Sequence, residues 1–376
     1  MRTVLILSLL LTASVARAEE ITFSGVGDMV FGRSGKRFGL DKPFSGVKHL
    51  FKGRDIVYGN LETPITATRY LMTRKPRKCP VRKRWCNPTD AKRYARLWRL
   101  TFYGRPKALS LLRGAGFTLL GTANNHAEDQ GRKGLLETIQ QVRKAGMAPA
   151  GTGATPEEAW KPFIYRKGGT SVGVIVATSL WNFPPMKGGS WYALAEFPRK
   201  VFKILPAKVR ALKAKVDFVV VALHFGEEYN HRPYNREMRL MKALEKAGCD
   251  LFIGGHPHVL RGIQVINRMV AFWSMGNFLF DATRGPQGES GIAHATFVKS
   301  GTTRSMKDIF FYPVRLNGTE PGRKWGRMPT VVKGTSARRL LKKMLRYSRW
   351  LKNSPGEITI DKDRIAIRPK AFTSGS

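Results

Sequence analysis

The sequence predicts an α/β protein in which buried strands alternate with helices. Apolar runs of strand length recur along the chain, for example at 21–26, 219–223 and 251–254. Helical patterns separate such runs, at about 133–144 and 236–246. Because strands that are buried on both faces read as continuous apolar runs, this alternation favours sheets that are covered on both sides.

The individual elements follow from local signals. Strands are expected over 21–26, 55–58, 117–120, 171–178, 216–223 and 251–253. The first helix should close at Gly146, and the pair of strands within 264–273 should turn at Asn267-Arg268. A last helix over 337–352 has apolar residues on one side and Lys or Arg on the other. It is either a packed surface helix or a helix that docks on anionic membrane.

Residues 1–18 predict a secretory signal, which makes the protein secreted or periplasmic. Arg2 precedes an apolar run from Val4 to Leu11, and Ala16-Arg17-Ala18 supplies the small residues that a signal peptidase accepts. An uncleaved anchor is the alternative interpretation. No later segment reaches the roughly 18 consecutive apolar residues of a membrane span. The remainder is expected to be one domain over 19–300 and a basic extension over 301–376 that completes or packs on it.

The formal net charge of +40 predicts an anionic partner. For an exported protein we expect an anionic polymer, a phosphorylated precursor or an anionic membrane surface, and no nucleic acid. The segment 69–107 is a basic insertion, with fourteen Lys or Arg, aromatic residues and the single acid Asp90. It either binds an extended anionic chain or is a solvated charged loop.

The three cysteines are too few for a disulfide scaffold. Cys79 and Cys86 lie in the basic insertion and could close a disulfide in an oxidising compartment. Cys249 precedes an apolar strand and is expected to pack as a small hydrophobic residue.

Polar side chains follow the ends of several predicted strands. They are Asp28, Glu62, Asn125, His224, and the two histidines of Gly255-His256-Pro257-His258. In open α/β sheets, ligands bind beyond the carboxyl ends of the strands, so these groups are expected to share one site. Each residue alone also has an ordinary structural explanation, such as a turn former or a satisfied histidine. The other histidines, His49, His231 and His294, lack this setting.

Carboxylate, amide oxygen and imidazole together predict a divalent metal site, with one or two ions of the Mn, Fe or Zn type. Two metals that share a carboxylate can hold a phosphoryl group between them. His126 follows Asn125 directly and is predicted to be the catalytic acid that protonates a leaving oxygen. Arg33, Asn124 and Arg261 are predicted to bind substrate.

Six segments follow one another along the chain: GDMVFGR (27–33), GNLETPIT (59–66), TANNHAEDQGRKGL (122–135), HFGEEY (224–229), GGHPHVLRG (254–262) and WSMGNFLFD (273–281). Together they resemble the CapA family of poly-γ-glutamate capsule synthesis proteins, which share the calcineurin-like metallophosphatase fold. The likeness covers about 21–281. It implies a four-layer α/β/β/α sandwich of two mixed β-sheets flanked by helices.

The resemblance also implies a division of the ligands. One metal would be bound by Asp28, Glu62 and His258, and the other by Glu62, Asn125, His224 and His256, with His126 as the acid. The chain departs from the phosphatase pattern at Val30, where a histidine is usual, and at Glu62, where an aspartate is usual. A mononuclear site and a pair of ions therefore both remain open.

Two functions fit these features. The first is an exported, metal-dependent hydrolase of phosphoester or related bonds in the synthesis of an anionic surface polymer. The second is a non-catalytic accessory that binds the polyanion during assembly or export, through the basic insertion.

Overall fold

The computed structural model describes residues 19–33, 36–37, 42–70, 101–182, 191–192, 200–281, 285–318, 328–352 and 356–369. Several sequence predictions lie outside these residues: the signal over 1–18, most of the basic insertion with Cys79 and Cys86, and the side chain of Arg33.

Within the described residues, the larger sheet has ten strands and is mixed. In spatial order its main strands are β19 (Gly356–Asp361), β20 (Arg364–Pro369), β17 (Thr303–Gly318), β16 (Glu289–Ser300), β1 (Glu19–Met29), β4 (Ile56–Leu61), β5 (Leu119–Gly121) and β6 (Ala148–Ala150). β15 (Asn277–Leu279) pairs with β1, and β18 (Met328–Val331) pairs with β17. The pairs from β1 to β6 are parallel, whereas β16 runs antiparallel to β1 and to β17.

The second sheet has six strands among the described residues and is also mixed. Its order is β13 (Ile263–Ile266), β14 (Met269–Phe272), β12 (Leu251–Gly255), β11 (Phe218–His224), β9 (Thr170–Thr178) and β8 (Phe163–Lys167). β14, β12, β11 and β9 are parallel, and the two edge strands are antiparallel to their neighbours. Two short ribbons complete the strands: β2 (Gly32–Arg33) with β3 (Lys36–Arg37), and β7 (Thr152–Gly153) with β10 (Trp191–Tyr192).

The two sheets pack face to face around a shared apolar core. Phe23 on β1 and Phe297 on β16 belong to the same buried cluster as Val174 on β9 and Phe218 on β11. The rings of Phe218 and Phe297 lie 5.0 Å apart between the sheets. Alternate residues along each strand point to this core or to an outer face, which is the expected consequence of the pleat.

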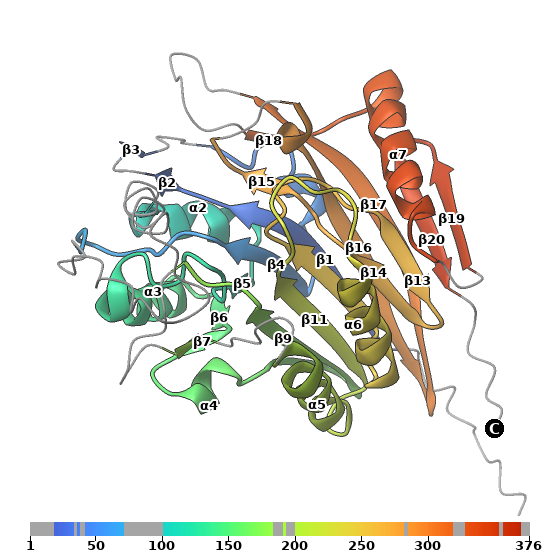
Figure 1. The fold of residues 1–376 in the computed structure, drawn as a ribbon, viewed down its shortest axis with the longest axis horizontal. Helices are drawn as coiled ribbons and strands as arrows, with labels where there is room; N and C mark the ends of the chain where they lie inside the picture. Colours follow the sequence, from blue (N-terminus) through green and yellow to red (C-terminus); the bar gives the residue numbers. More distant parts are fainter. Residues whose placement is uncertain are drawn as a thin grey trace, which may run out of the picture.

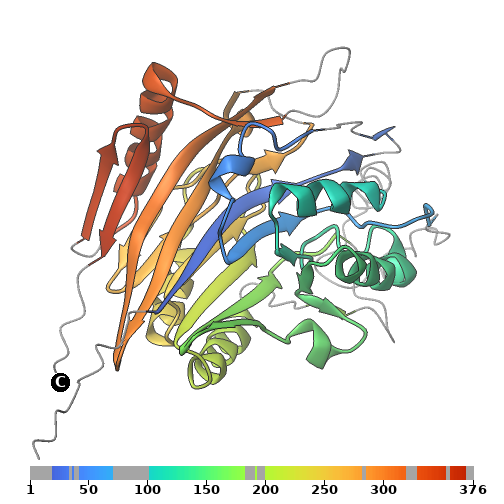
Figure 2. The same cartoon turned by 180° about the vertical axis from the view of Figure 1, so that it is seen from behind.

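Helices cover the outer faces of both sheets. α2 (Lys107–Ala115) and α3 (Gly131–Lys144) share a buried cluster with outward residues of β4 and β5, while α5 (Val201–Lys213) and α6 (Asn235–Lys246) share another with β9, β11 and β12. Figures 1 and 2 show these helices on opposite sides of the stacked sheets. The predicted four-layer sandwich is therefore confirmed. The short elements η1 (Lys48–Leu50), α4 (Pro156–Ala159) and η2 (Gly285–Gly288) lie in connections.

The C-terminal extension adds β17, β18, β20 and β19 to the larger sheet and carries α7 (Gly334–Arg349), which lies against β13, β17 and β20 (Figure 1). The apolar side of α7 is buried, through Ala337, Leu340, Leu341, Met344 and Tyr347. The sequence left open whether this helix packs on the fold or docks on anionic membrane, and packing on the fold accounts for its apolar side. Among the described residues, no helix has both the length and the apolar character that a membrane span requires.

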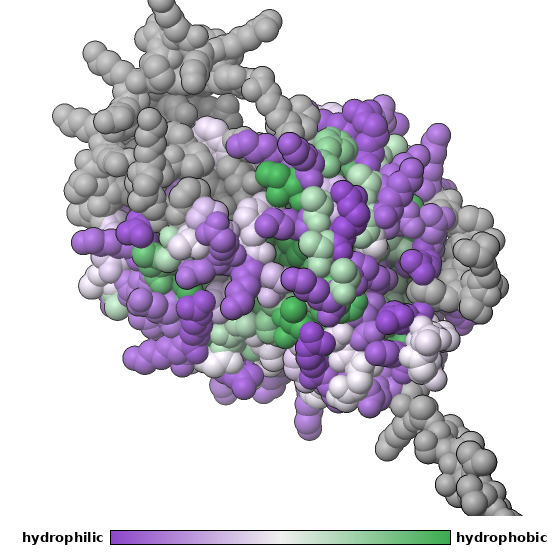
Figure 3. Space-filling model, turned by 90° about the horizontal axis from the view of Figure 1, so that it is seen from below, coloured by the Kyte–Doolittle hydropathy of each residue, from purple (hydrophilic) through white to green (hydrophobic). Residues whose placement is uncertain are grey.

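Seen from below, the described surface is mostly hydrophilic, with smaller hydrophobic groups between the polar side chains (Figure 3). Cys249 is buried, as expected, and its pKa is raised by burial. The structure also contains elements that the sequence patterns did not predict, namely α2, α5 and the long β16–β17 pair.

Candidate metal centre

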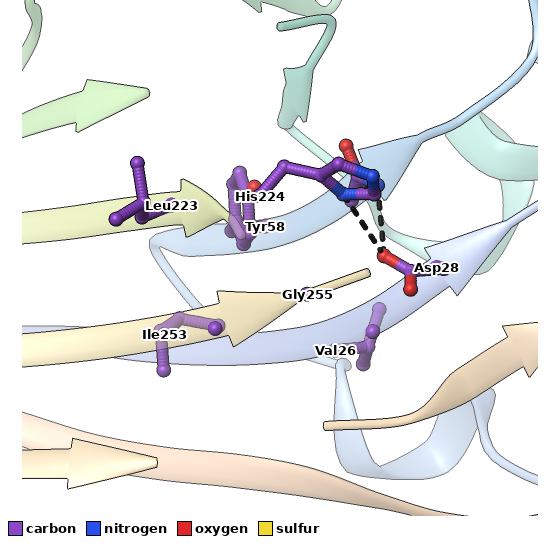
Figure 4. A pocket seen from close by; sticks show the side chains of 10 residues that line it. Val26, Asp28, Tyr58, Leu223, His224, Ile253 and Gly255 are labelled. Atoms are coloured by element: carbon purple, nitrogen blue, oxygen red, sulfur yellow. Dashed lines mark hydrogen bonds and ion pairs between the residues drawn. The ribbon is translucent and has the colours of Figure 1, made fainter. Parts of the chain in front are cut away.

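The carboxyl ends of neighbouring parallel strands bring the candidate ligands together. On β1, Asp28 lies in register with Asn60 on β4, and in the other sheet His224 at the end of β11 is in register with Gly255 on β12. Figure 4 shows Asp28 and His224 pointing toward each other from the two sheets. A small cavity beneath them is lined by Val26, Tyr58 and Ile253. The site thus lies where the two sheets meet, above the apolar core.

The loop after β12 holds its two histidines in an unusual backbone conformation. His256 has a φ of 94° and His258 a φ of 57°, which is the region that non-glycine residues rarely adopt. Strained residues of this kind persist only where the surroundings hold them, and they gather at functional sites. Here the backbone N–H of His256 donates to Asp28 Oδ2 at 2.9 Å. Gly255 leaves room for that carboxylate, because an added Cβ would lie 2.6 Å from Asp28 Oδ1.

Two groups of metal-ligand side chains share Glu62. Glu62, His224 and His256 form one group, and Asp28, Glu62 and His258 form the other. Within each group the candidate ligand atoms all lie within 4.8 Å of one another. Glu62 Oε1, for example, is 3.5 Å from His224 Nε2. Around an ion with bonds of about 2.0–2.2 Å, neighbouring ligand atoms lie roughly 3–3.5 Å apart, so the donor set fits a divalent metal.

Burial sets the charge state of these ligands. Desolvation lowers the pKa of His224 and of His256 well below the usual histidine value, and the neighbouring histidines lower it further. Both imidazoles are therefore neutral and have a lone pair to offer. Burial raises the pKa of Asp28 to about 6, although hydrogen bonds from His256 and Asn60 lower it in part.

The loop after β5 contributes Asn125 and His126 to the same site. Asn125 Oδ1 lies 2.8 Å from His224 Nε2, so the amide oxygen faces the group that contains Glu62 and His224. His126 Nδ1 lies 2.6 Å from Asp129 Oδ2, and its Nε2 lies 4.0 Å from Glu62 Oε1. The imidazole ring stacks on Phe102 at 3.8 Å between centroids. Asp129 holds the imidazole ring at Nδ1 and Phe102 holds one face of it, while Nε2 points toward the proposed metal ligands.

Comparison with known proteins identifies the family of this chain. Residues 22–282 match the family model described as bacterial capsule synthesis protein PGA_cap. The chain belongs to this bacterial capsule synthesis protein family. It is similar to the PGA biosynthesis protein CapA of Bacillus subtilis strain 168, at 30% identity over 76% of this chain and 70% of that protein. It is also similar to the capsule biosynthesis protein CapA of Bacillus anthracis, at 31% identity over 70% of this chain and 60% of that protein.

The match therefore spans between three fifths and seven tenths of the length of these two relatives. Among solved structures, the fold is similar to that of the 5'-nucleotidase from Candida albicans SC5314, with a TM-score of 0.38 and 11% identity. That alignment covers 73% of this chain and 47% of the other. At this distance, the likeness has no bearing on function.

In this capsule synthesis family member, three asparagines that sequence reasoning did not single out surround the ligands. Asn60 Nδ2 donates to Asp28 Oδ1 at 2.8 Å and lies 3.1 Å from His224 Nδ1. Asn277 Oδ1 lies 2.9 Å from His258 Nδ1. Asn182 Oδ1 accepts from Asn125 Nδ2 at 3.1 Å. Such second partners fix the orientation of a ligand and are typical of metal sites.

Asp129, the partner of His126, was also missed. Its position three residues after His126 was a usable signal, because this spacing joins two side chains within one turn. Asn60 and Asn277 lie in the segments that resemble CapA, and both are at strand ends. By contrast, nothing in the sequence marks Asn182, which follows β9 by four residues and contacts the site through a loop.

Two of the residues predicted to bind substrate, Arg261 and Asn124, contact the protein itself. Arg261 is fully buried and donates to Glu237 Oε2 at 3.0 Å and to the carbonyl of Asn230 at 2.8 Å. Its guanidinium therefore faces the protein, where it anchors the loop of His256 and His258. Gly226, at a φ of +98°, leaves room for this guanidinium, since an added Cβ would lie 2.8 Å from Arg261 Nη1.

Asn124 is also buried and serves the loop in which it lies. Its Nδ2 donates to Asn60 Oδ1 at 3.2 Å and to the carbonyl of Leu61 at 3.0 Å, and its Oδ1 accepts from the His126 N–H at 3.1 Å. The side chain of Arg33 is outside the described residues. The three histidines that were set aside lie away from the two ligand groups: His49 is exposed, His231 stacks on Tyr347, and His294 contacts Arg54.

Proposed function

We propose that this protein is an exported, metal-dependent hydrolase of a phosphoester, or of a related ester or amide, in an anionic surface polymer or its precursor. The observation that carries the proposal is the pair of ligand groups that share Glu62 at the junction of the two sheets. Membership of a capsule synthesis family supports an anionic polymer as the setting. The names of the Bacillus relatives, which refer to PGA and capsule biosynthesis, point the same way.

The ligands divide between two ions in this proposal. Asp28, Glu62 and His258 would hold one, and Glu62, Asn125, His224 and His256 would hold the other. A divalent metal bound here would supply Lewis acidity and would activate water near neutral pH. A substrate would have to place the bond that breaks within reach of both the ligands and His126.

The protein's own residues prepare the acid. Asp129 accepts a hydrogen bond from Nδ1–H of His126, and this fixes the tautomer so that Nε2 is left to exchange a proton with the substrate. Phe102 keeps the ring in one plane. In its doubly protonated form, with Nδ1–H on Asp129, His126 would donate the proton of Nε2 to the leaving oxygen or nitrogen, which is the role that its distance from the ligands allows.

The test is the double variant His256→Ala/His258→Ala, measured for metal content and for turnover of bis(4-nitrophenyl) phosphate. Both should fall to background, because each ligand group loses a member. His49→Ala is the matched control, since His49 is exposed and lies away from both groups. Turnover by the double variant at the rate of the control would overturn the proposal.

A second candidate function is favoured by the net charge of +40. In this case the protein is a non-catalytic accessory that binds polyanion during assembly or export. Three results of a polyglutamate-binding assay would together favour the accessory. Binding would fall steeply with salt, would survive the double histidine change, and would be lost when the cations of 74–84 are replaced. Binding that is unchanged when the cations of 74–84 are replaced would count against the accessory.

A further inference from the structure

The outer side of α7 presents several cations and no acid. From 333 to 352 the chain has eight Lys or Arg and no acid. Arg338, Lys342, Arg346 and Arg349 are exposed, and at 100° per residue they lie within about 80° of one another around the helix axis. They extend over about 16 Å along the axis. We call these four residues the α7 stripe.

The stripe is not neutralised by neighbouring acids in the described structure. Lys343, beside it, pairs with Glu289 at 2.6 Å, and Asp363 accepts from the N–H of Gly334 at the start of the helix. No ion pair is recorded among the described residues for Arg338, Lys342, Arg346 or Arg349. Arg346 lies over the ring of Tyr347, which leaves its charge at the surface. Like charges held this close cost free energy unless an anion is shared among them.

The buried side of α7 rests on the segment that follows the metal-ligand loop. The N–H of Ile263 donates to Ser348 Oγ at 2.9 Å, and Gln264 Nε2 donates to the carbonyl of Lys352 at 2.7 Å. The ring of His231 stacks on Tyr347 at 4.5 Å, and its Nδ1 lies 2.7 Å from the carbonyl of Leu260. The stripe is therefore the outer side of an element whose inner side touches the residues directly after His258.

We infer that the α7 stripe is a docking surface for a linear polyanion with repeated carboxylates. A single file of cations along a helix axis matches a chain of charges that lies parallel to it. The apolar side of α7 is buried against the sheets, and Trp350 at its end is the one exposed large apolar side chain of this described helix, so recognition by the stripe rests mainly on charge. This surface adds a recognition site to the proposed hydrolase and does not depend on catalysis.

The experiment compares two variants of the full chain that lose the same number of charges. One changes the α7 stripe (R338Q/K342Q/R346Q/R349Q), and the matched control changes four exposed cations of α5 and α6 (K203Q/R210Q/R239Q/K242Q). Fluorescence anisotropy with labelled poly-γ-glutamate measures binding at low and at physiological salt. The stripe variant should bind at least about tenfold more weakly at low salt, and the control less than about threefold.

Two further measurements separate this inference from the proposed function. The stripe variant should hydrolyse bis(4-nitrophenyl) phosphate at the wild-type rate, and H256A/H258A should bind polymer like wild type. Thermal unfolding of both charge variants should match wild type, because the changed side chains are exposed. Equal binding by the stripe and control variants would overturn the inference. So would stripe-dependent binding to phosphatidylglycerol vesicles without any to the polymer, which would assign the stripe to a membrane.

Discussion

The candidate metal centre and the α7 stripe are both polar regions of one chain, but they are built in opposite ways. At the candidate metal centre, the polar groups are buried and several have fixed partners, as Asp28 does with Asn60 and the N–H of His256. On the stripe, the cations are exposed and have no recorded acid partner among the described residues. Buried networks concentrate large energies in single residues, whereas exposed charges act together and weakly. The two regions should therefore respond very differently to single substitutions.

The largest single effect on stability is expected at Arg261. Arg261→Leu leaves Glu237 buried without its cation and should lower the free energy of unfolding by about 3–5 kcal/mol, as measured by urea denaturation. The double variant Arg261→Leu/Glu237→Leu should recover part of this loss, because no uncompensated charge remains. Arg232→Leu, at an exposed arginine nearby, serves as control. If Arg261→Leu lowered the free energy of unfolding no more than Arg232→Leu does, the contrast between buried and exposed charges would be wrong.

Asp129 should affect rate and leave the metal in place. Asp129→Asn is expected to lower kcat by about 10²-fold, because His126 loses the carboxylate that fixes its tautomer. The pH profile of kcat should change shape as well, which a purely structural role would not cause. Metal content, measured in parallel, should equal that of wild type. An unchanged kcat and pH profile would rule out His126 as the acid that Asp129 positions.

Asn182 should affect metal affinity by a smaller factor. Asn182→Ala removes the acceptor that orients the amide of Asn125, and the metal dissociation constant should rise about tenfold. Asn182→Asp keeps an acceptor at the same place and is the matched control, with an affinity at least that of wild type. Equal affinities of Asn182→Ala and wild type, by calorimetric titration with Mn²⁺ or Zn²⁺, would show that Asn125 needs no such support.

The smallest effect is expected for one cation of the stripe. Lys342→Gln should weaken polymer binding by less than about threefold and leave the stability unchanged, because an exposed charge contributes at most about 1 kcal/mol. Anisotropy titrations at two salt concentrations measure it. If Lys342→Gln alone lost as much polymer affinity as the fourfold stripe variant, Lys342 would belong to a defined binding pocket. The stripe would then depend on single residues, as the buried site does.

Much of this architecture is readable from the sequence, because buried parallel strands leave a strong local signal. Continuous apolar runs such as the one that ends at His224 show where strands stop, and the polar residues at those stops lie together in the structure. The same logic does not reveal β17, where the charged pair Lys307-Asp308 comes shortly before the aromatic run Phe310-Phe311-Tyr312. A pattern this mixed has no clear period.

The role of Arg261 was not readable for a different reason. An arginine in a strongly basic chain predicts a surface or an anion contact, and only the fold places it on Glu237, 24 residues away. Asn182 likewise depends on how the loop after β9 crosses that of Asn125. Residues that contact substrate or metal at strand ends can be proposed from sequence, whereas residues that support them through loops depend on tertiary packing.

Glu62 belongs to both ligand groups, so metal binding to the variant Glu62→Gln tests the central claim most directly. This substitution keeps the size of the side chain and removes its charge. Elemental analysis of purified protein after dialysis should give one or two divalent ions per chain for wild type and background for Glu62→Gln. A wild type at background, or a variant that retains as much metal as wild type, would contradict the assignment of this site to a metal.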